Sequence, residues 1–485
     1  MLLAASLVLV SSGSSAPPSV ATLLQQLARV DALGEDARGH DPDAVQARYD
    51  AARELQELLA GRTVRAACAP LLEAIARAAA GHVLAAEGVD RLDRAVERRG
   101  EEAVRRARAA VRSERSGCPP ATRLTSRPPS DAQPLVRPLD GEAFFGSVRA
   151  MPPSGATSVE LRWNGRVVSR LSEVAGSSVE LSLAGRVRVG PGDVELRFLD
   201  RLGAAAGRAR AEDVWLLPPN GRIGVASERP DRALSRRLAA ITSGFSGYAA
   251  VYVRELATGR TGSWNGDARF PAASLVKLGV LAAALDRYGP RPERSPTFHD
   301  VHAIAAWSSN LGANRLYARL GRGVVESRLR RMGATRSTYP GDYRVGTSAG
   351  SPNAVPGEPP LVSQRVTTAL DMGRVLATLH AAATGSTQAR RASRLTAHEA
   401  RVALALLLSS EPRGDNLGLF RPSLTAGTPA VQKHGWISSA RHSAAIVYGP
   451  NGPVVVVVLT YQEGISLARA RELARRVLGA SGLGR

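Results

Sequence analysis

The chain has 485 residues, and its 64 Lys plus Arg outnumber its 43 Asp plus Glu to give a formal net charge of +21. A chain of this length is expected to fold into two to four domains with hydrophobic cores. Aromatic residues make up only 4%, and no Lys/Arg-rich block is interleaved with them. This composition argues against a nucleic-acid-binding protein and favours an anionic cell envelope as the charged partner.

The first residues have the pattern of a targeting segment. An apolar run covers residues 2–10, and small residues follow at Ser14 to Ala16, as at a cleavage site. We therefore predict a signal peptide over 1–16 and a secreted or extracytoplasmic location. No Lys or Arg precedes the run and Pro17 follows the proposed cut, so a buried N-terminal helix is the alternative. No later stretch has 18 uninterrupted apolar residues, and no other membrane span is expected.

Residues 17–118 have the spacing of α-helices. Apolar residues recur every three or four positions, and we expect four helical segments, at 20–30, 41–61, 63–85 and 87–115. The two cysteines of the chain, Cys68 and Cys118, fall in this region. An even, sparse count in an exported protein predicts one structural disulfide, and two unpaired core thiols are the alternative.

A proline-rich linker is expected over residues 119–138, because proline fixes φ and lacks an N–H donor. Residues 139–218 then alternate apolar and polar side chains, as strands do, and Asn164-Gly165 predicts a tight hairpin turn. Short strands at this spacing predict a small immunoglobulin-like β-sandwich, with Trp163 in its core.

The last part of the chain, residues 231–485, has the pattern of one α/β (α+β) domain. Its middle is mostly helical, and the expected elements around it are a helix at 231–242, strands at 248–256, 260–264, 431–438, 443–448 and 454–460, and a closing helix at 467–478. This order predicts a mixed sheet with helices packed on it.

Ser274 and Lys277 lie three residues apart at the start of an apolar run that predicts a buried helix. Residues at this spacing share a helix face, so the Lys amine can reach the Ser hydroxyl. A serine needs a neighbouring base to become a nucleophile, and a lysine in an apolar pocket can be that base. Lys277 and Lys433 are the only lysines in the chain. Arg, which supplies all the other positive charge, cannot act as a base, so a chemical role is predicted for both lysines; chance placement is the alternative.

Two further motifs follow in the expected order. Residues 308–310 read Ser-Ser-Asn, with Asn314 four residues on, and residues 433–435 read Lys-His-Gly at the front of a predicted strand. With Ser-x-x-Lys, these elements make residues 231–485 resemble the catalytic domain of class A β-lactamases, within the penicillin-recognising serine hydrolases. Residues 367–372 resemble the helix that follows the family's omega loop.

The resemblance implies acyl-enzyme chemistry. Ser274 would attack the acyl carbonyl, and Lys277 would take or relay its proton. Ser308, assisted by Lys433, would pass a proton to the departing nitrogen; Asn310 or Ser308 as a simple helix cap is the alternative. The substrate-binding set would be Asn310, His434, Gly435 and Trp436, with the backbone N–H groups of Ser274 and Trp436 as the oxyanion hole.

Two substitutions depart from the family's pattern in the motifs themselves. Ser309 replaces an Asp that braces the site. His434 replaces a hydroxyl residue that helps to bind the substrate carboxylate, and it would do so as a neutral donor or as a cation. A strand-surface His without a contact is the alternative.

The deacylating Glu of the omega loop has no evident counterpart. The candidate loop, residues 337–360, carries only two acids, Asp342 and Glu358, and neither has the expected neighbours. If Asn353 matches the loop's Asn, the Glu position falls on Ala349. We therefore expect acylation to be better equipped than deacylation.

These features predict an exported serine hydrolase that acts by acyl-enzyme formation on β-lactams or related amides. The alternatives are a cell-wall peptidase or esterase on the same scaffold, and a catalytically weak protein that binds the cell envelope. The expected partners are a small-molecule or peptide substrate and the anionic envelope, with no nucleic acid. The eight His are scattered, so neither a metal site nor a cofactor is expected.

Overall fold

The computed structural model describes residues 17–60, 62–126, 136–174, 178–290, 297–343, 357–361, 363–409 and 417–484. The chain forms two compact units, Met1–Ser130 and Asp131–Arg485, and each is described by itself. The predicted signal peptide at 1–16 lies outside the described residues.

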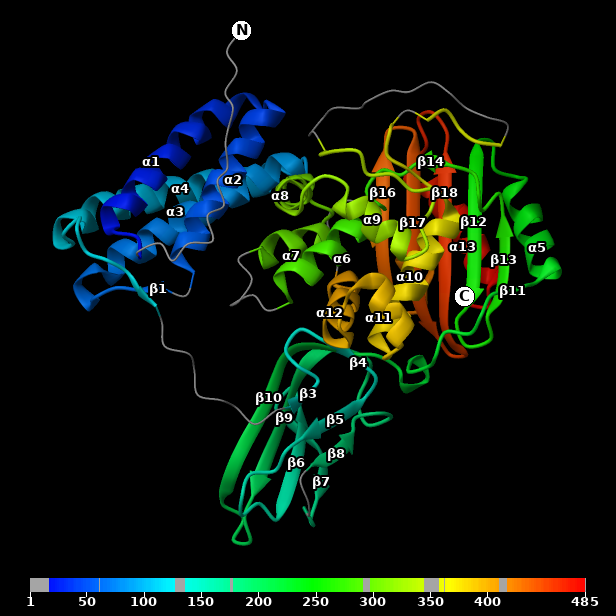
Figure 1. The fold of residues 1–485 in the computed structure, drawn as a ribbon, viewed down its shortest axis with the longest axis horizontal. Coiled ribbons are helices and arrows are strands. Elements are labelled where there is room, and N and C mark those ends of the chain that lie inside the picture. Colours follow the sequence, from blue (N-terminus) through cyan, green and yellow to red (C-terminus); the bar gives the residue numbers. More distant parts are fainter. Residues whose placement is uncertain are drawn as a thin grey trace. The chain divides into compact units, whose positions relative to one another are not determined.

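The first unit is helical (Figure 1), with α1 (Val20–Asp36), α2 (Pro42–Leu59), α3 (Ala69–Asp90) and α4 (Arg94–Glu114). Side chains of Asp41 and Asp93 cap α2 and α4 by accepting backbone N–H groups. A disulfide joins Cys68, just before α3, to Cys118, just after α4, which confirms the predicted pairing. The bond therefore ties together the outer ends of a helical hairpin.

The predicted break between the third and fourth helices, at 85–87, is wrong, because α3 continues through Gly88 to Asp90. Gly88 and Gly100 lie where α3 and α4 touch. A Cβ at Gly88 would come within 2.2 Å of the Glu97 nitrogen, and one at Gly100 within 2.3 Å of the Ala85 nitrogen. Glycine here permits close helix packing and does not end the helix.

Among the described residues, the helical stretch Ala66–Asp90 is the one long and apolar enough to cross a membrane by length and composition, and half of its most apolar window is buried inside the unit.

The second unit begins with a β-sandwich. One sheet has the strand order β4-β10-β9-β6-β7 and the other β3-β5-β8; the strands are β3 (Val136–Arg137), β4 (Ala143–Phe144), β5 (Ser147–Ala150), β6 (Ser158–Trp163), β7 (Arg166–Leu171), β8 (Val179–Ser182), β9 (Gly190–Leu199) and β10 (Ala205–Leu216). Asn164 and Gly165 both have positive φ, as the predicted tight turn requires. Trp163 is buried in the sandwich core, and the immunoglobulin-like topology stays a prediction.

The sandwich starts earlier than predicted, because Val136 and Arg137, which fall in the expected linker, pair with β5. It is fastened to the rest of its unit by polar contacts. The buried carboxylate of Glu142 is bonded to His398 Nδ1 at 2.6 Å and accepts a hydrogen bond from Arg401 Nε at 3.2 Å. Trp215 Nε1 donates to Ser409 Oγ at 3.1 Å.

A six-stranded sheet of order β11-β13-β12-β18-β17-β16 organises the remainder (Figure 1). Its strands are β11 (Arg229–Pro230), β12 (Tyr248–Glu255), β13 (Arg260–Trp264), β16 (Ala430–Ile437), β17 (Ala440–Gly449) and β18 (Gly452–Tyr461). The helices are α5 (Arg232–Thr242), α6 (Lys277–Tyr288), α7 (Phe298–Ala306), α8 (Asn310–Leu320), α9 (Val324–Arg331), α10 (Ala369–Ala383), α11 (Thr387–Ser393), α12 (Ala397–Leu408) and α13 (Leu467–Ala480). The predicted mixed sheet with packed helices is confirmed.

Both faces of this sheet are buried, which explains the uninterrupted apolar run in β18. Val456 and Val458 join a core with α5 and α13, whereas Val455 and Val457 join the larger core on the opposite face. Successive strand residues point to opposite faces, so a central strand covered on both sides needs apolar residues throughout.

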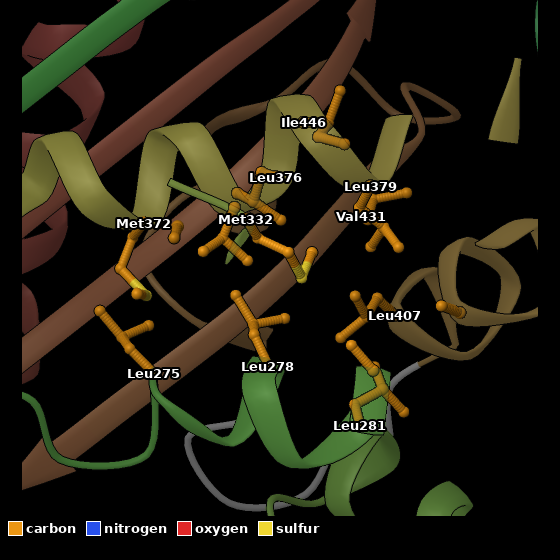
Figure 2. Close-up of a cluster of buried hydrophobic side chains, with 14 of the residues drawn as sticks. Leu275, Leu278, Leu281, Met332, Met372, Leu376, Leu379, Leu407, Val431 and Ile446 are labelled. Atoms are coloured by element: carbon orange, nitrogen blue, oxygen red, sulfur yellow. The ribbon is translucent and has the colours of Figure 1, made fainter. Parts of the chain in front are cut away.

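The larger core holds α6 in place. Figure 2 shows side chains at three-residue intervals along the α6 segment facing α10 and the sheet; the labelled residues are Leu275, Leu278, Leu281, Met332, Met372, Leu376, Leu379, Leu407, Val431 and Ile446. Truncating a buried leucine of this kind typically costs about 2–5 kcal/mol. The turn that precedes α6 is therefore held by a well-packed helix.

Candidate active site

Ser274 lies in the turn that precedes α6. The helix begins at Lys277, so the prediction that both residues share its first turn is wrong in detail. Ala273 has a φ of 46°, and this left-handed residue bends the chain between the short strand β14 (Phe270–Pro271) and the helix. The Lys277 N–H still donates to Ser274 O at 3.3 Å. Ser274 itself is half-buried and thus open to a substrate.

The amine of Lys277 is directed toward the second motif. The side chain is fully buried, and its Nζ donates to Ser308 O and to Asn310 Oδ1, each at 2.6 Å. The structure therefore joins the first two predicted motifs through Lys277. The approach of this amine to the Ser274 hydroxyl stays a prediction.

The two serines of the second motif make different contacts. Ser309 is the N-cap of α8, and its side chain accepts the Gly312 N–H at 3.1 Å. Ser308 precedes it in a left-handed conformation, with φ at 66°. Because Ser309 caps the helix, the Ser308 hydroxyl is left to contact another element.

That element is β16, the edge strand of the large sheet. Lys433 is 1% exposed, and its Nζ donates to Ser308 Oγ at 2.6 Å and to His434 O at 2.8 Å. Burial, together with the nearby Lys277 ammonium, lowers the pKa of Lys433 well below its usual 10.5. The only two lysines of the chain thus meet at one residue, Lys277 at the Ser308 carbonyl and Lys433 at its hydroxyl.

Gly435 allows β16 to approach the nucleophile turn. A Cβ at this position would lie 2.9 Å from the Ser274 nitrogen and 3.2 Å from the Ala272 oxygen, so a side chain would force the two segments apart. The next residue, Trp436, is 44% exposed. The strand therefore brings the Gly435–Trp436 backbone beside Ser274, where the oxyanion hole was predicted.

His434 is a neutral imidazole at pH 7. Its side chain is buried, and burial first, then the cations of Lys433, Lys277 and Arg421, lower its pKa well below the usual 6.5. Of the two predicted forms of His434, the structure therefore supports the neutral hydrogen-bond donor and argues against the cation. Whether His434 contacts a substrate stays a prediction.

Sequence reasoning missed Arg441, a cationic residue beside Trp436. Arg441 pairs with Trp436 across β16 and β17, and its guanidinium lies 5.4 Å from the centroid of that ring. Arg441 thus places a guanidinium group, whose planar fork of donors matches a carboxylate, beside Trp436. The chain contains many Arg residues, and no local sequence pattern distinguishes Arg441 from the others.

Neither Glu358 nor Asp342, the two acids of the candidate loop, has the surroundings expected of a deacylating base. Glu358 is buried and accepts bonds from the Arg269 backbone N–H at 3.0 Å and from its guanidinium at 2.9 Å. Burial alone would raise the pKa of Glu358, but these bonds outweigh it and the pKa is lowered. Asp342 is exposed, and Ala349 and Asn353 lie outside the described residues.

Sequence reasoning also missed Tyr343, whose ring centroid lies 4.3 Å from Lys277 Nζ. The Asn314 side chain makes two hydrogen bonds with the Tyr343 backbone. Its Nδ2 donates to Tyr343 O, and its Oδ1 accepts the Tyr343 N–H. Asn314 is part of the second motif, but no sequence pattern links it to Tyr343, which lies 29 residues further along the chain. Within the described ranges, no group of three or more His, Cys, Asp or Glu could hold a metal ion.

Comparison with known proteins finds a family match in the C-terminal part of the chain. Residues 233–289 and 292–479, about half of the chain, match the model of the beta-lactamase enzyme family. No curated protein matches the chain. Similar solved structures include PBP-A, at 18% identity over 53% of this chain and 98% of that one, with a TM-score of 0.41.

Two further solved structures are named β-lactamases. The enzyme from Desulfarculus baarsii DSM 2075 is 23% identical over 50% of this chain and 96% of that one, with a TM-score of 0.38. A variant of the class A β-lactamase of the last common ancestor of Gram-negative bacteria is 26% identical over 51% of this chain and 98% of that one, with a TM-score of 0.40. On the family match, this chain belongs to the beta-lactamase enzyme family, whose domain forms its C-terminal part.

Proposed function

We propose that this protein is an exported serine hydrolase that forms an acyl-enzyme on Ser274 with β-lactams or related amides. The observation that carries the proposal is the meeting of the only two lysines at Ser308, with Gly435 bringing β16 against the Ser274 turn. A chain that otherwise uses Arg has placed its two deprotonatable cations at one serine.

The proposed acylation begins at Ser274. Its hydroxyl attacks the amide carbonyl while Lys277 takes the proton. Lys277 acts in its neutral form, in which the amine donates through its N–H groups, as to Ser308 O and Asn310 Oδ1, and also carries a lone pair. Its lone pair can then act on the Ser274 hydroxyl. The backbone N–H groups of Ser274 and Trp436 would stabilise the oxyanion.

Departure of the amide nitrogen requires a proton. Ser308 Oγ would deliver it, and the Lys433 ammonium, 2.6 Å away, would stabilise the developing charge and restore the proton. Asn310 and the neutral imidazole of His434 would bind the substrate by hydrogen bonds. Arg441 would supply the charge for a substrate carboxylate, because its guanidinium stays protonated.

Export is supported by the disulfide, since such bonds persist in oxidising compartments. The excess of positive charge would favour contact with an anionic cell envelope. Detection of the mature protein outside the cytoplasm, with cleavage near residue 16, would test this part of the proposal.

Intact-protein mass spectrometry with benzylpenicillin tests the acyl-enzyme directly. The expected result is one acyl group on the wild-type chain, mapped to Ser274, and none on Ser274→Ala. Ser263→Ala is a matched control, because this serine is exposed on β13 and should leave labelling unchanged. Labelling of another serine, or persistent labelling of Ser274→Ala, would contradict the assignment. A parallel panel of peptides and esters would separate a lactamase from a peptidase or esterase.

A further inference from the structure

Tyr343 contacts Lys277 and Ala273, the residue that precedes Ser274. Its ring centroid lies 4.3 Å from Lys277 Nζ, and its hydroxyl donates to Ala273 O, next to Ser274, at 2.8 Å. The guanidinium carbon of Arg365 lies 4.0 Å from the centroid of the same ring. An aromatic side chain therefore fills the space beside the lysine and the nucleophile turn.

The position of Tyr343 is fixed from both ends. Asn314 holds its backbone through two hydrogen bonds, and the side chain is only 9% exposed. Its ring packs edge-on against Tyr339, with 5.7 Å between centroids. A ring held by its backbone, its hydroxyl and two neighbours is not expected to swing aside when substrate binds.

The hydroxyl of Tyr343 is not suited to activate water. It is committed as a donor to Ala273 O, and burial raises its pKa well above the usual 10. Glu358 is held by Arg269, and Asp342 is exposed. In the described part of the chain, the space beside Lys277 thus contains a neutral aromatic residue where hydrolysis would need a base and a water molecule.

We propose that Tyr343 shields the acyl bond on Ser274 from water and so makes release of the acyl group slow. Hydrolysis would require a water oxygen to attack the ester carbonyl, give one proton to a base, and break the bond to Ser274 Oγ, which regains a proton as the carboxylic acid leaves. The Tyr343 ring occupies the place of the water and offers no base. The inference rests on the proposed acyl-enzyme and makes Tyr343 a positioning residue that sets the balance between acylation and hydrolysis.

The test compares acylation and deacylation rate constants for the full chain with benzylpenicillin, followed by intact mass. Tyr343→Ala is expected to speed deacylation by about 10-fold or more, with a smaller change in acylation, because water gains access. Tyr343→Glu adds a base and is expected to speed deacylation by about 10²–10⁴-fold. Tyr343→Phe keeps the ring and should retain slow deacylation.

Tyr448→Ala is the matched control, because it removes a buried tyrosine whose ring packs instead against Phe145 and His380. It is expected to lower the melting temperature but not to speed deacylation. The inference is overturned if the wild-type adduct hydrolyses rapidly, or if neither Tyr343→Ala nor Tyr343→Glu changes deacylation in variants that still acylate. Absence of any wild-type adduct would instead overturn the proposed function, and this inference with it.

Discussion

The two sides of Ser274 differ in what they offer to a reaction. On the side of β16 and the residues before α8, Lys433 donates a hydrogen bond to Ser308, and Gly435 lets the β16 backbone approach the Ser274 turn. On the side of Tyr343 and Glu358, the described residues present an aromatic ring and a carboxylate already neutralised by Arg269. Forming an acyl-enzyme and hydrolysing it make separate demands, and in our proposal the residues of the first side serve only its formation.

The largest expected effect is at Lys277. Lys277→Arg keeps the positive charge but removes the base, because guanidinium does not lose its proton at neutral pH. Acylation is expected to fall by about 10²–10⁴-fold. Quenched time courses of penicillin labelling measure this rate. A variant that acylates as fast as the wild type would show that the base lies elsewhere.

Gly435→Ala tests the backbone on the same side. The added Cβ would meet the Ser274 nitrogen at 2.9 Å, so the strand and the turn must separate and the oxyanion donors must move. Acylation is expected to fall by about 10²–10³-fold, as when one such donor is lost. Gly224→Ala is the control, because nothing lies within 4 Å of its added Cβ. Equal behaviour of the two variants would refute the assigned role of Gly435.

The pH dependence of acylation sharpens the role of Lys433. Its pKa is lowered by burial and by Lys277, so its ammonium is present at low pH and is lost as pH rises, below the usual 10.5. If the ammonium assists Ser308, acylation should decline on the alkaline side below that value. Lys433→Arg, permanently charged, should show no such decline even where its rate is reduced. If the wild type and Lys433→Arg both showed the alkaline decline, the decline would belong to the titration of another group.

The protonation state of His434 leads to a second expectation for the pH dependence of acylation. Because its folded-state pKa lies well below 6.5, it is already neutral above that pH. No decline of acylation with carboxylate-bearing substrates is therefore expected between pH 6.5 and 8, contrary to what a cationic His434 would give. A decline centred near pH 6.5 that His434→Asn abolishes would show that substrate binding restores the cation.

The smallest effect on rate is expected from Glu358→Gln on the other side of the serine. Since Arg269 already occupies this carboxylate, deacylation should change by no more than about threefold, far less than removal of a general base would give. The free energy of unfolding should fall by about 1–3 kcal/mol, because a buried pair with a partly exposed partner is broken. Glu472→Gln, in an exposed pair, is the matched control. A large loss of deacylation would identify Glu358 as the missing base.

The residues proposed for acylation could be picked out from the sequence because they lie in short motifs with fixed spacing. Ser-x-x-Lys, Ser-Ser-Asn and Lys-His-Gly each place reactive groups on one turn or one strand, and the rarity of lysine singled out Lys277 and Lys433. The β18 core strand and the Asn164–Gly165 turn were likewise predictable, since burial on two faces and positive φ both restrict residue choice.

The other side could not be predicted because its contacts join residues far apart in the chain. Tyr343 acquires its role from Lys277, Ala273 and Asn314, none of which is its neighbour in sequence. The Glu358–Arg269 pair spans 89 residues. The end of α3 was missed for a related reason, because the packing of Gly88 against Glu97 of α4 cannot be read from the sequence.

Stopped-flow kinetics with a chromogenic cephalosporin test the central claim most directly. Acylation without an efficient deacylating base predicts a burst of about one equivalent per enzyme, then slow turnover, with an adduct on Ser274 that survives on a denaturing gel. The burst should vanish in Ser274→Ala. Fast linear hydrolysis with neither a burst nor a trapped adduct would contradict the account, because it would require a deacylating base that the described side of Tyr343 and Glu358 does not contain.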